Sequence, residues 1–145
     1  MESAADSVAK DGIGCTSQLE FSLNSAAQTM CRELLEALLT SDAAKCSEYE
    51  RTPNERHGGI HEKKVATLFG LVGPIPRTYY HGKDSKGGST GHYPWDEQMG
   101  LVGRHTPAVI SEVMRLAAIH GYEEAAQEFE NAHGFRISAD TIRDI

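Results

Sequence analysis

The chain has 145 residues and a formal net charge of −7, with 39% hydrophobic and 24% charged residues. This length fits one domain or two very small ones, and the composition is that of a globular protein with a modest core. No stretch approaches the roughly 18 apolar residues of a transmembrane helix, and the acidic N-terminus lacks the apolar region of a secretory signal. Three cysteines without a motif spacing suit a reducing compartment, so we expect a cytoplasmic protein that does not enter a membrane.

The charge is distributed unevenly along the chain. Residues 1–60 and 106–145 are acidic, whereas residues 61–105 carry six basic and four acidic side chains. A surface that binds DNA needs basic side chains that displace counterions from the phosphates. Only the middle of the chain therefore favours contact with DNA, and the overall charge argues against strong autonomous binding.

The first part of the chain predicts an arm followed by a helix. Residues 1–23 are rich in Ser, Ala, Gly and Asp without sustained periodicity, which is typical of a flexible arm. Residues 24–62 form a helical segment in which residues 27–38 place apolar side chains at helical spacing. The members of this stripe are Ala27, Met30, Cys31, Leu34, Leu35 and Leu38. Such a stripe requires a partner, which is either the core of this domain or the same helix of a second subunit in a homo-oligomer.

The middle of the chain, residues 63–105, changes to strand signals. It predicts a β-hairpin that turns at Gly70 or at the Gly73–Pro74 pair. Two prolines in the second strand cannot donate ladder hydrogen bonds, which predicts an edge strand or an interrupted one. Residues 81–93 contain four glycines and no periodicity, and they predict a long loop.

Residues 106–145 carry the most regular pattern and predict three helices in a helix-turn-helix-like unit. Thr106 is a favourable N-cap for the first helix, and Gly121 ends it. Gly134 is well placed to end the second helix, and Ser138 to cap the third. The predicted fold class is therefore α+β, with an N-terminal helix, a small β-hairpin with a long Gly-rich loop, and a C-terminal three-helix unit.

Short motifs follow one another along the second half of the chain. They are Thr67-x-Phe69-Gly70-x-Val72, Arg77-x-Tyr79-Tyr80, Pro94-x-Asp96, Gly100-Leu101, Thr106-Pro107, Tyr122-Glu123-x-Ala125-Ala126 and Ile137-Ser138-x-x-Thr141-Ile142. In this order and spacing they resemble the N-terminal region of bacterial insertion-sequence transposases of the ISKra4 type. The resemblance covers roughly residues 60–145 and implies a part of such a protein that binds DNA or assembles with other subunits.

The resemblance also implies an absence of catalysis. Transposases of this type continue into a nuclease domain whose acidic residues hold two metal ions, which activate the attacking group and stabilise the leaving oxygen. The resemblance places the end of this chain where that domain would begin. We therefore expect a truncated transposase-like protein that is not an enzyme on its own, with no catalytic residue and no cofactor.

The chain departs from the family at its cysteines. The family carries cysteine pairs on both sides of the hairpin, similar to a zinc-binding ribbon, whereas this chain has His81 after the second tyrosine. A structural zinc site needs about four Cys or His ligands. The candidates available are Cys46, His57, His61, His81 and His92. Because their spacing matches no zinc motif, we interpret them as surface residues and predict no metal site.

Two sets of side chains are candidates for contact with duplex DNA. The first belongs to the helix-turn-helix-like unit, in which the third helix would be the recognition helix, and comprises Arg136, Thr141 and Arg143. The second lies on the hairpin and its Gly-rich loop and comprises Lys63, Lys64, Arg77, Lys83 and Lys86. Both sets have a structural alternative, because short amphipathic helices also form ordinary bundles and lysines also blunt exposed strand edges.

A group of aromatic residues completes the list of candidates. The side chains of Tyr79, Tyr80, Tyr93 and Trp95 could stack on bases, although aromatic residues around a loop in a small domain more often form its core. Two hypotheses for function result. The first is DNA recognition or assembly by a transposase-like front end, and the second is a self-association module that does not bind DNA.

Overall fold

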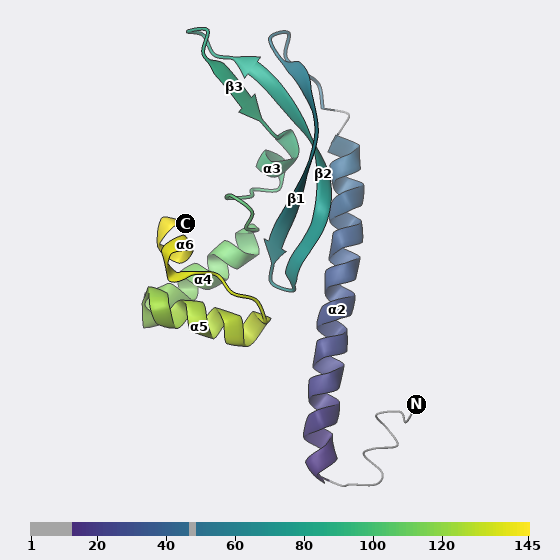
Figure 1. Cartoon of the computed structure of the whole chain (residues 1–145), viewed down its shortest axis with the longest axis vertical. Helices are drawn as coiled ribbons and strands as arrows, with labels where there is room; N and C mark the ends of the chain where they lie inside the picture. The colour runs from purple at the N-terminus through teal and green to yellow at the C-terminus, as the bar shows by residue number, and fades with distance from the viewer. Residues whose placement is uncertain (1–12, 47–48) are drawn as a thin grey trace.

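The computed structural model describes residues 13–46 and 49–145 (Figure 1). The elements, in chain order, are α2 (Ile13–Lys45), β1 (Arg56–Thr67), β2 (Gly70–Lys83), β3 (Ser89–His92), α3 (Pro94–Gln98), α4 (Pro107–His120), α5 (Tyr122–His133) and α6 (Ala139–Asp144). An N-terminal helix, a three-stranded antiparallel sheet and a C-terminal group of helices make up a mixed α+β structure, so the predicted fold class is confirmed.

Helix α2 is much longer than the sequence pattern indicated. It begins at Ile13, so residues 13–23 are helical and not the arm that was expected, while residues 1–12 of that arm lie outside the described residues. The C-terminal half of α2 packs along β2, where Leu39 and Ala43 are buried against the sheet. Its N-terminal half projects beyond the sheet (Figure 1). Extending a helix that already exists costs much less than nucleating one, which explains how residues 13–23 can be helical although little of the protein covers them.

The two long strands form the predicted hairpin, and its turn is at Gly70, the first of the two predicted positions. Thr67 lies opposite Gly70, so Leu68 and Phe69 form the loop between the strands. The backbone φ of Gly70 is +112°, which a residue with a side chain rarely adopts. The hydroxyl of Thr67 donates to the Gly70 carbonyl at 2.8 Å and helps to close the turn.

The sheet is larger than the predicted hairpin. Strand β1 begins at Arg56 and not at residue 63, and β2 continues to Lys83 and pairs with β3, which shortens the loop expected over residues 81–93 to residues 84–88. The glycines in these segments weaken the strand pattern in the sequence. The segments become strands because they pair with a neighbouring strand. The segment expected to be helical over residues 24–62 is thus helical as far as Lys45, whereas its last part, from Arg56, belongs to β1.

Strand β2 is the central strand of the sheet, but only its last residues have a strand on both sides. Its pairing with β3 starts only at Tyr80, so the part that contains Pro74 and Pro76 is paired with β1 alone. The register with β1 also shifts between Lys63 and Val65, opposite this part. The prolines are accommodated because β2 is irregular there and lacks a second strand neighbour, in agreement with an interrupted strand.

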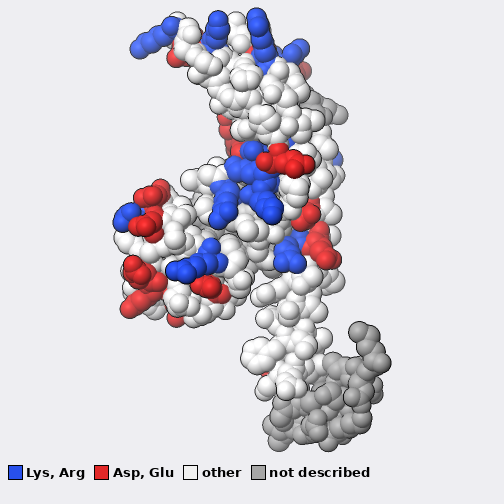
Figure 2. Space-filling view, in the orientation of Figure 1, with Lys and Arg blue, Asp and Glu red and all other residues white. Residues whose placement is uncertain are grey.

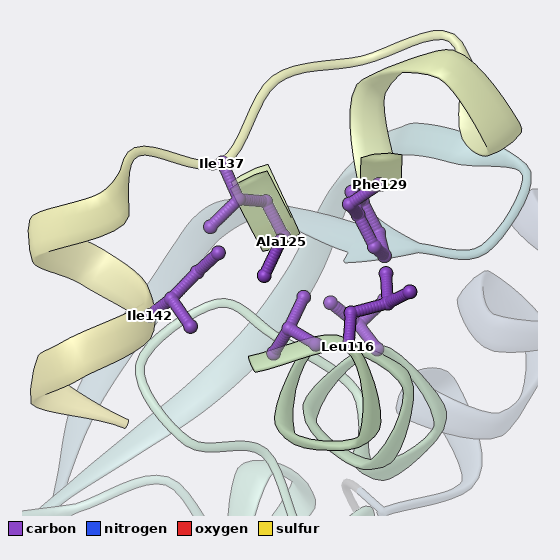
Figure 3. Close-up of a cluster of buried hydrophobic side chains, with 7 residues drawn as sticks. Leu116, Ala125, Phe129, Ile137 and Ile142 are labelled. Atoms are coloured by element: carbon purple, nitrogen blue, oxygen red, sulfur yellow. The ribbon is translucent and has the colours of Figure 1, made fainter. Parts of the chain in front are cut away.

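The C-terminal helices have the caps that the sequence predicted. The Thr106 hydroxyl accepts a hydrogen bond from the Val109 amide at 3.4 Å, and the Ser138 hydroxyl accepts one from the Thr141 amide at 3.1 Å. Helices α4 and α5 end at Gly121 and Gly134, both with positive φ. Figure 3 shows the core of this unit, which contains Val109, Val113, Leu116, Ala125, Phe129, Ile137 and Ile142.

Backbone hydrogen bonds attach the helical unit to the hairpin. The Ala66 amide donates to the Arg104 carbonyl at 2.7 Å, and the Thr106 amide donates to the Ala66 carbonyl at 3.1 Å. The His133 ring contacts the Leu68 carbonyl at 3.0 Å, which joins the end of α5 to the hairpin turn. None of the described helices combines the length and the apolar character needed to cross a membrane.

Candidate nucleic-acid interface

The centre of the hairpin holds an ion-paired cluster. Arg77 on β2 is only 6% exposed and forms an ion pair with Asp96 on α3. The Lys63 Nζ atom lies 2.8 Å from the same carboxylate oxygen of Asp96 and also donates to the Gly103 carbonyl. The Arg77 guanidinium lies over the ring of Tyr93, 3.9 Å from its centroid. The cluster therefore joins β1, β2 and α3, and it leaves Arg77 almost no surface for a phosphate.

The tip of the sheet forms a cleft of about 550 Å³ where the ends of the three strands meet the segment before β1. Its lining is formed by Pro53, Asn54, Arg56, His57, His81, Gly82, Lys83 and Ser89. Two of these side chains are permanently cationic, two are imidazoles, and the described lining contains no carboxylate. Figure 2 shows Lys and Arg side chains gathered at this end of the molecule. The cleft therefore has the charge that attracts an anion.

Strand pairing brings the cleft residues together. Arg56 lies opposite His81, and His57 lies opposite Tyr80, across the β1–β2 ladder. A Cβ atom on Gly58 would come within 2.6 Å of the Tyr79 ring and 2.7 Å of the His81 ring. The close packing of these rings thus requires glycine at position 58.

The loop between β2 and β3 presents two lysines beside the cleft. The Asp84 carboxylate accepts hydrogen bonds from the Lys86 amide at 2.9 Å and from the Gly88 amide at 2.6 Å. These bonds hold the turn with the side chains of Lys83 and Lys86 exposed. Because the Asp84 carboxylate is bonded to the loop backbone, it shapes the turn that carries both cations.

The wall of the cleft is held in place by His92. Its ring lies 2.7 Å from the Glu55 carboxylate and 2.9 Å from that of Glu97. Glu55 also accepts a hydrogen bond from the Thr52 amide at 2.9 Å and one from the Tyr49 hydroxyl at 3.3 Å. These contacts fasten residues 49–55 to β3 and α3.

The pair of His92 and Glu55, called the His92 clamp below, has shifted pKa values. Burial lowers the pKa of His92, but the hydrogen bonds to Glu97 and Glu55 outweigh it, and the net pKa is raised above 6.5. The hydrogen bond from the Thr52 backbone lowers the pKa of Glu55, and the bond with His92 adds to this effect against desolvation. The clamp is therefore strongest when His92 is protonated and Glu55 is ionised.

A second basic region lies along β1. Lys64 is exposed on β1, and Arg104 is exposed on the neighbouring segment whose carbonyl accepts from Ala66. Figure 2 shows a group of basic side chains over the middle of the molecule, next to acidic ones. Burial lowers the pKa of the adjacent His105, and the positive charges of Arg104 and Lys63 lower it further, although the hydrogen bond with Val102 opposes them.

The residues predicted in the helix-turn-helix-like unit are surrounded by acids. Arg143 forms ion pairs within its own short helix with Asp140 at 2.9 Å and Asp144 at 3.7 Å. The Thr141 hydroxyl lies 2.8 Å from the Ser138 hydroxyl within the helix cap. Arg136 lines a hollow together with Glu123, Glu130 and Asp140. These three predicted contacts therefore lie in an electrostatic setting that repels phosphate.

The residues considered for zinc have other partners. In the described part of the chain, no group of three or more His, Cys, Asp and Glu side chains is arranged to hold a metal ion. Cys46 contacts Gln98, and His61 contacts the Tyr93 hydroxyl at 2.8 Å. His92 belongs to the clamp, while His57 and His81 lie in the cleft.

The four aromatic residues belong mainly to the folded interior. Tyr80 is 3% exposed and Trp95 is 1% exposed, and the Trp95 indole donates to Asp42 of α2 at 3.1 Å. Tyr79 and Tyr93 are half-buried, and their rings lie 4.8 Å apart between centroids. The structure therefore agrees with a core role for Tyr80 and Trp95.

Sequence reasoning missed part of the cleft. It identified Lys83 and Lys86, but it assigned residues 24–62 to a helical segment, so Arg56 was not a candidate and His57 and His81 were grouped only as possible zinc ligands. The chain matches no protein-family model, no curated protein and no solved structure, so the resemblance to transposases rests on the motifs quoted above.

Proposed function

We propose that this chain binds duplex DNA through the tip of its sheet, as the DNA-binding part of a transposase-like protein without strand-transfer activity of its own. The observation that carries the proposal is the cleft lined by Arg56, His57, His81 and Lys83, with Lys86 on the adjoining loop. The order of the motifs between residues 67 and 142 supports the transposase-like assignment.

Electrostatics favour the sheet tip over the third helix of the C-terminal unit. Arg56, Lys83 and Lys86 are exposed cations whose charges can neutralise phosphates and release counterions. Arg143 is already paired with two carboxylates of its own helix. The proposed contacts of the tip are with the phosphate backbone of the DNA. Such contacts provide affinity and orientation but do not select a base sequence.

The test is the salt dependence of binding to a short duplex, measured by fluorescence anisotropy. The triple variant Arg56→Ala, Lys83→Ala, Lys86→Ala should bind more weakly than the unmodified chain. The slope of log K against log salt concentration should fall in magnitude by about 0.9 for each phosphate contact that is lost. A smaller loss is expected for Lys64→Ala, because Lys64 lies on β1 away from the cleft lining.

The matched control is Arg115→Ala. Arg115 is an exposed cation on α4 that pairs with Glu112 at 2.8 Å, so its removal lowers the net charge by one, as each single substitution at the tip does, without touching the tip. The control should keep the affinity and the slope of the unmodified chain. Absence of binding at low salt, or equal losses in the control and in the triple variant, would refute the proposal.

We propose self-association through α2 as a second function. The specific observation is that the predicted apolar stripe divides between two faces of this helix. Leu35 packs against the core formed with the sheet, whereas Met30, Leu34 and Leu38 are 66%, 61% and 58% exposed. Large exposed apolar surfaces in small proteins commonly mark interaction sites. Self-association is compatible with DNA binding, because the two surfaces lie on different elements.

A further inference from the structure

Helix α2 has apolar side chains on two opposite faces. The face that contacts the sheet includes Leu39 and Ala43, which are buried. The opposite face carries Leu23, Met30 and Leu34, and the side chain of each is more than 60% exposed. A helix in water normally keeps only one apolar stripe, which it buries. The second stripe is therefore available for another protein surface.

The N-terminal half of α2 is also largely uncovered by the described residues, although Ser25, Gln28 and Thr29 border a hollow beside the hairpin turn. From Thr16 to Met30 every residue is exposed except Leu19 and Gln28, which are partly buried. Figure 1 shows this half of α2 projecting past the sheet. A helix of this length without tertiary contacts is marginal in water, so a partner along it would stabilise it.

The apolar positions of this segment are arranged symmetrically. On the face opposite the sheet they are Leu19, Leu23, Ala26, Ala27, Met30 and Leu34, while Phe21 and Cys31 point to other sides of the helix. Reversing the direction of the helix about the midpoint between Ala26 and Ala27 superimposes the set on itself. In an antiparallel pair of such helices, Leu19 faces Leu34, Leu23 faces Met30, and Ala26 faces Ala27. A two-fold axis requires this self-complementary arrangement, because the same patch must serve both subunits.

We propose that two copies of this chain pair antiparallel through residues 19–34 of α2, about a two-fold axis between Ala26 and Ala27. This inference rests on the proposed self-association and adds the orientation and register of the pair. The alanines at the centre allow the two backbones to approach closely, and the leucines and methionines on either side fill the interface.

The distribution of charge along α2 also favours a second copy of this chain as the partner of the exposed stripe. Glu20 is the only charged residue between Thr16 and Cys31. A neutral surface offers no attraction for a strongly charged partner, and an uncharged apolar strip is compatible with a copy of itself.

The first experiment measures the mass of the full chain in solution by light scattering. The expected mass is twice 15.8 kDa. Leu23→Glu and Met30→Glu should each give a folded monomer, because both positions are exposed within one copy. Its circular dichroism spectrum should lose no more helical signal than the unpaired half of α2 contributes. The matched control is Ile119→Glu on α4, where an equally exposed residue lies outside the stripe, and it should remain dimeric.

The second experiment determines the orientation by disulfide formation in a chain whose native cysteines are replaced by serine. Ala26→Cys should crosslink, because the two copies of residue 26 are offset by a single residue. Leu23→Cys should not crosslink with itself, because its copies would lie about 10 Å apart along the helix axes. A mixture of Leu23→Cys and Met30→Cys chains should crosslink.

The outcomes distinguish self-association as such from the antiparallel pairing through α2. A monomer would overturn self-association altogether. A dimer that persists in Leu23→Glu and Met30→Glu, or one in which Leu23→Cys crosslinks with itself, would overturn the antiparallel pairing and leave self-association by another surface in place.

Discussion

At the scale of single residues, the motifs that suggested a DNA-binding protein have structural roles in the fold. The arginine of the Arg-x-Tyr-Tyr motif and the aspartate of the Pro-x-Asp motif, Arg77 and Asp96, pair with each other across 19 positions of sequence. Neither residue suggests this partner in the sequence, because proximity arises only when α3 folds against β2. The pair fixes where the chain leaves the sheet for the helical unit.

Replacing Arg77 by alanine should therefore destabilise the fold strongly. The change leaves the Asp96 carboxylate without its buried partner, and breaking a buried ion pair on one side costs about 3–5 kcal/mol. Lys63 remains near Asp96 at 2.8 Å and should keep the loss toward the lower end of this range. The measurement is the free energy of unfolding in urea.

Lys64→Ala is the control for this variant, since Lys64 is an exposed neighbour on β1. It should change the free energy of unfolding by no more than about 0.5 kcal/mol. Equal stability of the Arg77 and Lys64 variants would show that the central ion pair does not hold the hairpin to α3.

The His92 clamp gives the protein a pH-dependent contribution to stability. Because the folded state raises the pKa of His92 above 6.5, it binds the proton more tightly than the unfolded chain does. This contribution is fully present below pH 6.5 and is lost as the pH rises through the pKa of the folded state. Glu55 has a lowered pKa, so its contribution is present above pH 4.5 and is lost as the pH falls.

His92→Gln should remove this contribution. Glutamine cannot carry a charge, so the difference in thermal midpoint between the unmodified chain and the variant should be largest at the acidic end of a range from about pH 5 to 8 and should decrease toward the basic end. His105, whose lowered pKa acts in the opposite direction, is common to both proteins and cancels in the difference. A difference in thermal midpoint that stays constant over this pH range would contradict the stabilising role of protonated His92.

At the scale of elements, the accuracy of prediction depended on how local the signal was. The caps at Thr106, Ser138, Gly121 and Gly134 involve residues close in sequence, and all of them were predicted correctly. Strand β3 and the first part of β1 depend on a neighbouring strand and were missed. The buried face of α2 was misassigned in part, because the helix has two apolar stripes and only the position of the sheet selects between them.

Phe129→Ala is expected to disrupt the helical unit. Phe129 is fully buried between α4 and α5, and its ring lies 5.1 Å from that of Phe135. Truncating a buried phenylalanine costs about 3–5 kcal/mol. The unfolding midpoint should fall accordingly when it is measured by circular dichroism.

Tyr122→Ala serves as the comparison on the same helix. Tyr122 is 49% exposed at the start of α5, so its truncation should cost much less. If the two variants lost the same stability, the cluster drawn in Figure 3 would not be the main core of this unit.

At the scale of the whole molecule, the two proposals place their surfaces at separate ends. The basic cleft lies at the tip of the sheet, and the free half of α2 projects in the opposite direction (Figure 1). In the proposed antiparallel pair, the sheet tips of the two copies would lie at opposite ends of the dimer. Such a dimer could engage two separate duplex segments, whereas each monomer could engage one.

The sequence by itself determined the fold class and the limits of the C-terminal helices, and it restricted the hairpin turn to Gly70 or the Gly73–Pro74 pair. Hydrogen-bonding and steric preferences of a few neighbouring residues decide such features. Only the tertiary structure decided that Arg77 is buried beside Asp96, that Arg56 and His57 join His81 and Lys83 in one cleft, and which face of α2 stays exposed. These features depend on contacts between residues far apart along the chain, and packing fixes such contacts where local preference does not.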